Sequence, residues 1–367
     1  MRFVKTEELV KGMRLAKPIY NKNGVLLYDR DTKLTKQGIN SIKNFGIIGI
    51  YILETIEPLP PMTEEDIEFE RFQTMSVFGL KEDMELLMLG KKPVNIENLI
   101  KILVKNYCKK DKKVNFMQNI RSTEDYVYKH CLNVAIMVSM MGARLKISNE
   151  DMRYIIYAAL IHDIGELIVG NDEDADELNK TGGKRNEVLT RYAQKGIKLL
   201  LDNVNIPSRV MDILNHRLRV LQNIKVEDIP EDIAMAASIL QVAEIYDDIT
   251  AMKIGEEPAS EVVAVRYLLG ESENLGSRVV GALIDSLKIL FPGICVELTN
   301  KMTGLVIKGN DDDVLRPIVL GFTDNIVYNL YDDKLYKVVQ IKDIMKSMDK
   351  RVHIDKATID EYMKMYN

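Results

Sequence analysis

The sequence predicts a mainly α-helical protein, a helical bundle with a small β-containing module at each end. Three observations support this fold class. From about residue 116 to residue 290, apolar residues recur at helical spacing almost without interruption. Short alternating or β-branched segments lie before and after that stretch. The proline-rich segment EPLPP at 57–61 separates the first module from the rest of the chain.

Residues 1–57 form the predicted N-terminal α+β module. Two short apolar runs lie on either side of Asn23-Gly24, a pair that favours a tight hairpin because both residues tolerate positive φ. A short helix is predicted over 35–44, and IIGIYIL at 47–53 predicts a further strand. Residues 58–115 are interpreted as a linker followed by a helical segment.

Residues 116–290 are the predicted helical domain. Its first helix should begin at an N-cap, Ser122 or Thr123, and end near Met141, with Gly142 close to its C-terminal end. The next should begin near Ser148 and end in YIIYAALIHDIG, whereas 171–183 should form a loop. Further helices are predicted over 186–201, 207–221, 231–252, 261–269 and 277–290.

Residues 291–367 are the predicted C-terminal β appendix with a terminal helix. ICVELTN, MTGLVIKGN, RPIVLGFT and KLYKVVQI alternate or are β-branched, and turns such as GNDDD separate them. Three or four strands are therefore expected.

Composition is typical of a globular protein of the cytoplasm. The chain has 367 residues, 46% of them hydrophobic, and a net charge of −5. No apolar run approaches the ~20 residues that span a bilayer, and MRFVKTEELVKG lacks the apolar core of a secretory signal. The three cysteines lie far apart without CxxC spacing, which indicates reduced thiols. Neither the charge nor the few aromatic residues favour binding to nucleic acid, duplex or single-stranded.

His162 and Asp163 are the most informative pair in the chain. They end a buried apolar helix, and a buried carboxylate without a partner costs several kcal/mol. A cation against Asp163 is therefore expected, and a metal ion shared with His162 would serve. Gly165 follows as a small residue that lets the backbone turn.

Three further residues in the same domain could complete such a site. His130 and His216 lie in apolar helical stretches, and Glu244 lies inside AMAASILQVAEIY. Taken singly, each has an ordinary explanation, since a lone histidine is usually a core residue and Glu244 could form a buried ion pair. Together they predict a mixed nitrogen and oxygen site for a divalent metal. Such an ion activates water for phosphoester hydrolysis.

The order H…HD…D in a helical bundle resembles the HD superfamily of metal-dependent phosphohydrolases, and more narrowly the HD-GYP group, bacterial phosphodiesterases that open cyclic di-GMP. AALIHDIGE resembles the family's ALLHDIGK, EDYVYKHCLNVA its DxYTxxHxxxVA, and QVAEIYDDITAM its VADxYDAMT. Both terminal modules also resemble segments found beside such domains. The resemblance implies an HD-type helical bundle and extends over nearly the whole chain.

The resemblance also implies roles for individual residues. His130, His162, Asp163 and Glu244 match metal ligands, with Glu244 in place of an aspartate. His216 matches the first histidine of the family's HHE motif and is a further expected ligand. Lys180 matches a lysine that contacts substrate phosphate. Asp163, Lys180, His216 and Arg217 are the expected catalytic residues, with Arg217 as a fork-shaped donor to phosphate.

Several positions depart from the family pattern. Tyr192 replaces the histidine of HPxxG, and Arg217 and Leu218 replace the second histidine and the glutamate of HHE. Glu166 stands where the family has a lysine after HDIG, and the GYP signature is missing from RLRVLQNIKVEDIP. These changes remove ligands that a second metal would need.

Three functional hypotheses remain open from the sequence. The first is a divergent phosphodiesterase that uses one or two divalent ions (Fe, Mn or Mg) on cyclic di-GMP or a related nucleotide. The second is a signalling protein that has lost turnover, with or without loss of the metal, and that binds a nucleotide or a protein partner. The third is an unrelated helical scaffold. The sequence leaves a homodimer open and gives no reason to expect a membrane partner.

Overall fold

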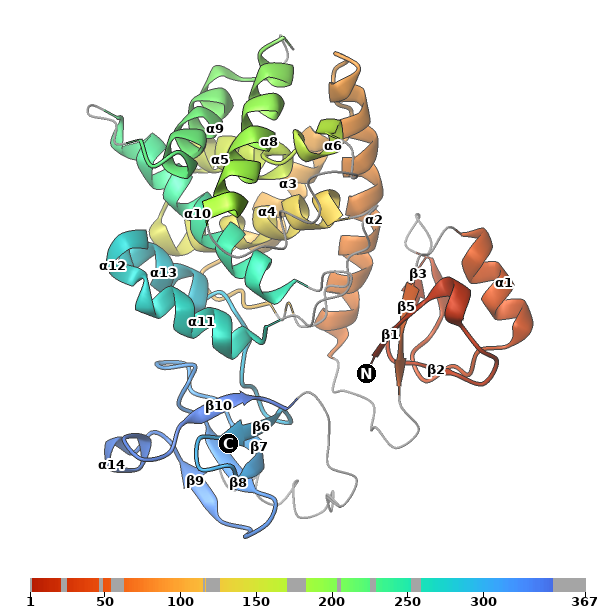
Figure 1. The fold of residues 1–367 in the computed structure, drawn as a ribbon, viewed down its shortest axis with the longest axis vertical. Helices are drawn as coiled ribbons and strands as arrows, with labels where there is room; N and C mark the ends of the chain where they lie inside the picture. The colour runs from red at the N-terminus through yellow and green to blue at the C-terminus, as the bar shows by residue number, and fades with distance from the viewer. Residues whose placement is uncertain are drawn as a thin grey trace.

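The computed structural model describes residues 2–20, 25–45, 49–53, 63–114, 116, 126–169, 183–202, 206–224, 229–251 and 259–345. A helical bundle forms the body of the molecule, a small α+β module lies beside α2 (Glu64–Met88), and a β-sheet lies beyond α11 (Glu261–Gly270) (Figure 1). The predicted fold class is therefore confirmed. No helix among the described residues is long and apolar enough to cross a membrane.

The N-terminal module has its own small core. Strands β1, β5 and β2 form an antiparallel sheet, and β3 pairs with β4 as the predicted hairpin, whose turn lies outside the described residues. Helix α1 begins after Thr35, whose hydroxyl accepts a hydrogen bond from the Gly38 N–H. The elements are β1 (Arg2–Lys5), the 3-10 turn η1 (Thr6–Glu8), β2 (Arg14–Leu15), β3 (Ile19–Tyr20), β4 (Leu26–Tyr28), α1 (Lys36–Asn44) and β5 (Gly49–Leu53).

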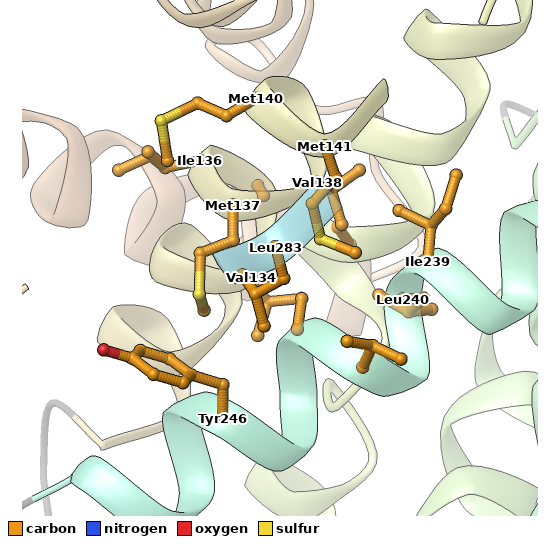
Figure 2. Packing of buried hydrophobic residues seen from close by; sticks show 14 of the residues in the cluster. Val134, Ile136, Met137, Val138, Met140, Met141, Ile239, Leu240, Tyr246 and Leu283 are labelled. Atoms are coloured by element: carbon orange, nitrogen blue, oxygen red, sulfur yellow. The ribbon is translucent and has the colours of Figure 1, made fainter. Parts of the chain in front are cut away.

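The bundle is organised around helix α4, which is buried on nearly all sides. Its apolar side chains pack against those of α10 and α13, among them Leu240, Tyr246 and Leu283 (Figure 2). The helices are α2 (Glu64–Met88), α3 (Ile96–Tyr107), α4 (Tyr126–Leu145), α5 (Asn149–Ile161), α6 (Glu166–Val169), α8 (Gly183–Leu201), α9 (Ser208–Leu221), α10 (Glu231–Thr250), α11 (Glu261–Gly270), α12 (Ser272–Leu275) and α13 (Ser277–Ile284).

The ends of two helices differ from the prediction. Helix α4 runs through Gly142 to Leu145, and a Cβ on Gly142 would lie 1.7 Å from the Cε atom of Met152. Gly142 therefore allows α5 to pack closely and does not end the helix. Helix α13 ends at Ile284 rather than near residue 290, because Leu287 and Val114 form a β-bridge. The expected N-caps Ser122 and Thr123 and the loop 171–183 lie outside the described residues, except that α8 begins at Gly183.

The C-terminal sheet has five strands in the order β10-β6-β7-β8-β9, all antiparallel, rather than three or four. KLYKVVQI is not one strand, because its first residues belong to α14 and its last begins β10. The predicted terminal helix lies outside the described residues. The elements are β6 (Cys295–Leu298), β7 (Thr303–Lys308), β8 (Ile318–Gly321), β9 (Val327–Asn329), α14 (Asp333–Tyr336) and β10 (Ile341–Ile344).

The apolar core of the bundle continues into this sheet. Val296, Val306 and Ile341 belong to the same buried cluster as the helices, and the Arg266 guanidinium of α11 donates to the carbonyls of Ile341 and Lys342. The N-terminal module instead has a separate cluster and contacts α2 through the ion pair of Lys17 with Glu70.

Candidate metal centre

The His162–Asp163 pair lies where α5 ends in the middle of the bundle. Ser148 caps the start of this helix through a hydrogen bond from the Asp151 N–H, and His162 is its C-cap. The last turns contain the small residues Ala158 and Ala159, both fully buried, which let α5 pack closely against neighbouring helices. His162 and Asp163 are consequently buried as well.

His130 of α4 faces His162 directly. The Nε2 atoms of the two rings lie 3.2 Å apart, and the Oδ2 atom of Asp163 lies 3.4 Å from each of them. Three potential ligand atoms, two nitrogens and one carboxylate oxygen, thus converge within 4.8 Å of one another. The sequence predicted these three residues, and the structure brings them together.

The outer nitrogen of each ring is held by an acceptor. The Nδ1–H of His130 donates to the Oδ2 atom of Asp247 at 2.5 Å, and the Nδ1–H of His162 donates to the carbonyl of Ala159 at 2.7 Å. Both acceptors are oxygens without a hydrogen, so the Nδ1 atoms must carry the protons. This arrangement turns both Nε2 atoms toward the shared point and is typical of metal-binding histidines.

Asp247 is itself held in place by a chain of side chains. Its Oδ1 atom accepts a hydrogen bond from the Asn133 amide at 3.0 Å, and the Asn133 carbonyl accepts one from the Gln73 amide at 2.7 Å. His130 is therefore positioned by residues from three helices, α2, α4 and α10. None of Asp247, Asn133 and Gln73 was among the predicted site residues.

The pKa values of the two histidines are shifted in opposite directions. Burial lowers the pKa of His130, but hydrogen bonds with Asp163 and Asp247 outweigh it and raise that pKa to about 10. Burial lowers the pKa of His162, and the carboxylates of Asp163 and Glu244 only partly oppose this. A proton between the rings therefore belongs to His130, and His162 keeps a free lone pair on Nε2.

Arg217 of α9 joins the two remaining acidic groups. Its Nη2 atom donates to the Oδ1 atom of Asp163 at 2.8 Å, and its Nε atom donates to the Oε1 atom of Glu244 at 2.7 Å. Burial lowers the pKa of Arg217, but these two carboxylates outweigh it and raise the pKa above its usual range. Despite the strong burial of Asp163, the neighbouring His162, Arg217 and His130 keep the pKa of its carboxyl well below the ordinary value.

The other predicted residues lie differently. Glu244 is near the centre, with its Oε1 atom 3.6 Å from the Nε2 atom of His162, but it is bound by Arg217. His216 precedes Arg217 on α9, and its buried Nδ1 atom has no hydrogen-bond partner among the described residues. It is not part of the three-residue group, so its role as a ligand stays a prediction. Lys180 lies outside the described residues.

Gly165 has a packing role in addition to the expected turn. A Cβ at this position would lie 1.9 Å from the backbone oxygen of Tyr192 and 2.7 Å from the backbone nitrogen of Gly196, both in α8. The backbone of the His-Asp turn therefore lies directly against α8, at Tyr192 and Gly196.

The residues present fit a divalent metal ion. Two imidazole nitrogens on one ion, each about 2.0–2.1 Å from it, lie roughly 3 Å apart, close to the separation of the two Nε2 atoms. Imidazole with carboxylate suits ions such as Fe²⁺, Mn²⁺ or Zn²⁺. The acceptor on each Nδ1–H supplies the outer support that such ligands need.

Sequence reasoning missed Asp247, although a signal for it was present. Asp247 follows Glu244 by three residues, so both lie on one face of α10, and it is buried in an otherwise apolar stretch. The adjacent Asp248 hid the signal, because one of two neighbouring aspartates is usually solvated.

Comparison with known proteins gives three findings. Residues 127–252 match the family model described as HD domain. The chain is 24% identical over 208 residues to a cyclic di-GMP phosphodiesterase of Pseudomonas aeruginosa. That match covers 55% of this chain and 49% of the relative, so the chain spans about half the length of the curated relative that it matches.

A solved structure described as an HDG"Y"P protein from Bdellovibrio bacteriovorus is also similar. It is 14% identical, the match covers 77% of this chain and 98% of that chain, and the TM-score is 0.44. The HD domain match includes His130, His162, Asp163, Glu244 and Asp247, and the predicted family resemblance is thereby confirmed.

Proposed function

We propose that this protein, whose residues 127–252 match the HD domain model, is a metal-dependent phosphodiesterase that hydrolyses cyclic di-GMP or a related nucleotide. The observation that supports this most directly is the pair of buried imidazoles whose Nε2 atoms converge with the Oδ2 atom of Asp163. The name of the curated relative supports the choice of a cyclic dinucleotide as substrate.

The roles of the residues follow from their contacts. His130, His162 and Asp163 hold the ion, which when bound supplies Lewis acidity and activates water for attack on a phosphoester. Asp247 and the Ala159 carbonyl fix the two rings in the tautomer that presents Nε2. Arg217 fixes Asp163 through its Oδ1 atom, which leaves Oδ2 facing the histidines.

A second candidate function is a signalling protein that binds a nucleotide or a protein partner without turnover. The contacts of Arg217 favour it, because the donors expected to face a phosphate are bound to Asp163 and Glu244. The metal centre can then serve binding or stability alone.

Hydrolysis and binding assays on the full chain separate the two functions. Protein loaded with Mn²⁺ or Fe²⁺ is incubated with cyclic di-GMP, and the linear product is measured by chromatography. Turnover that is lost in His162→Ala and Asp163→Asn, and kept in the histidine control His353→Ala, supports the phosphodiesterase. Binding of cyclic di-GMP by calorimetry without any linear product overturns it in favour of the binding protein.

A further inference from the structure

The Arg217 guanidinium is enclosed by the candidate metal centre. The side chain is only 5% exposed, and among the described residues it donates hydrogen bonds to Asp163, Glu244 and the backbone carbonyl of His162, the last at 3.4 Å. All three residues belong to the predicted ligand set. A buried cation is thus built into the protein beside the place where the metal is expected.

Arg217 binds one oxygen of each of two carboxylates, Asp163 and Glu244, beside the position expected for the metal. Asp163 gives Oδ1 to Arg217 and turns Oδ2 toward the histidines. Glu244 gives Oε1 to Arg217, although this atom also lies 3.6 Å from the Nε2 atom of His162. Oxygens from two carboxylates that converge on one point form a typical site for a hard divalent cation. In this protein Arg217 fills that point.

The charges of the buried cluster lead to the same conclusion. Its described members are three carboxylates, Asp163, Glu244 and Asp247, and one guanidinium. When a metal ion replaces the proton on His130, both histidines are neutral and these groups sum to −2. One divalent ion cancels this charge. A second ion would leave an uncompensated positive charge in a buried site, which is strongly unfavourable.

We propose that Arg217 is a fixed cation that replaces a second metal ion, so that the centre accepts a single divalent ion held by His130, His162 and Asp163. The single ion rests on the proposed function, whereas the replacement of a cation by Arg217 can be tested separately. Loss of the guanidinium frees oxygens of Asp163 and Glu244, and the capacity for divalent ions should rise by one.

Counting bound ions tests the proposal. Metal-free protein is titrated with Mn²⁺, and free Mn²⁺ is followed by electron paramagnetic resonance. Arg217→Gln and Arg217→His remove the fixed charge, Arg217→Lys keeps it, and the double variant Arg217→Gln with Glu244→Gln also removes one of the freed carboxylates. A variant that does not fold without metal is refolded in Mn²⁺ and counted after desalting.

We expect one ion per chain for the wild-type protein, Arg217→Lys and the double variant, and two for Arg217→Gln and Arg217→His. Equal counts for the wild-type protein and both single neutral variants overturn the proposal. A gain in Arg217→His alone also overturns it, because a new ligand and not the lost charge would then create the site. A wild-type count of zero argues against the proposed metal centre, while the gain of one ion on loss of the charge still supports the role of Arg217.

Discussion

The Nε2 atoms of His130 and His162 face each other at 3.2 Å, although the two residues are 32 positions apart in the chain and belong to different helices. Two imidazole nitrogens at this distance need a proton or a cation between them, since two lone pairs repel each other. Their Nδ1–H groups already donate hydrogen bonds to the Asp247 carboxylate and the Ala159 carbonyl. The predictions below follow from this arrangement and from the packing around it.

Removal of a proposed ligand should abolish metal binding. We expect His130→Ala, His162→Ala and Asp163→Asn each to weaken Mn²⁺ binding by more than the roughly 100-fold that loss of an outer-shell partner can cost. Dissociation constants from titration of the metal-free protein provide the measurement. His216→Ala should keep its metal if the three-residue group is the whole protein ligand set, and its loss of metal would instead make His216 a ligand.

Asp247→Asn should weaken metal binding although Asp247 is not one of the proposed ligands. The two oxygens of Asp247 accept hydrogen bonds from His130 and from Asn133. An asparagine keeps one of these oxygens and replaces the other with an amide nitrogen, which cannot accept, so one of the two hydrogen bonds is lost. We expect a loss of about 10–100-fold in Mn²⁺ affinity. The control is Asp248→Asn, whose carboxylate contacts the Tyr126 hydroxyl at 3.2 Å. If both variants bind Mn²⁺ like the wild-type protein, Asp247 does not position His130.

Gly165→Ala should destabilise the fold. The added methyl group would lie 1.9 Å from the Tyr192 carbonyl oxygen, and only a backbone shift between the His-Asp turn and α8 can relieve that clash. The expected cost is about 3 kcal/mol or more in the free energy of unfolding, measured by urea denaturation. Gly281→Ala is the matched control, because no atom lies within 4 Å of its added Cβ. That helical change should stabilise by roughly 0.5–1 kcal/mol. A Gly165→Ala protein as stable as wild type would show that the two backbones are not tightly packed.

Glu261 should make stability fall as the pH rises. Burial raises its pKa from 4.5 to about 8, and its Oε2 atom has no hydrogen-bond partner among the described residues. Between these values the folded state binds more protons than the unfolded state, so the stabilisation is full below pH 4.5 and is lost as the pH rises through about 8. At about 1.4 kcal/mol per pKa unit, the total reaches several kcal/mol.

The variant Glu261→Gln stays uncharged and should lose this pH dependence. Urea unfolding at pH 5 and pH 8.5 gives the difference, and the exposed Glu273→Gln should retain the wild-type slope. Parallel slopes for wild type and Glu261→Gln would mean that Glu261 is ionised in the folded protein.

The sequence predicted the elements of the bundle well because each has local signals. Helices begin next to Thr35 and Ser148, where they were expected, and the apolar run before His162 is buried. The support of the metal centre was not predictable in the same way. Asp247 contacts His130, 117 positions away, and Arg217 contacts Asp163 and Glu244, 54 and 27 positions away. The spacing from Glu244 places Asp247 on one face of α10, but it does not show which distant side chain this carboxylate contacts.

The role of Gly142 shows a similar limit. A glycine near a helix end favours a C-cap, yet α4 continues through this residue to Leu145, and a Cβ here would lie 1.7 Å from the Cε atom of Met152. Likewise, KLYKVVQI has the composition of a strand but contains the end of α14. In both places tertiary packing overrides local preference.

The two terminal modules differ in how they can be exchanged. Val296, Val306 and Ile341 share one apolar core with the bundle, so a cut after residue 290 would expose interior surface on both fragments. The N-terminal module closes its own core and contacts α2 through the ion pair of Lys17 with Glu70. In protein engineering, the N-terminal module can therefore be transferred to another protein by itself, whereas the C-terminal sheet must be transferred together with the helices.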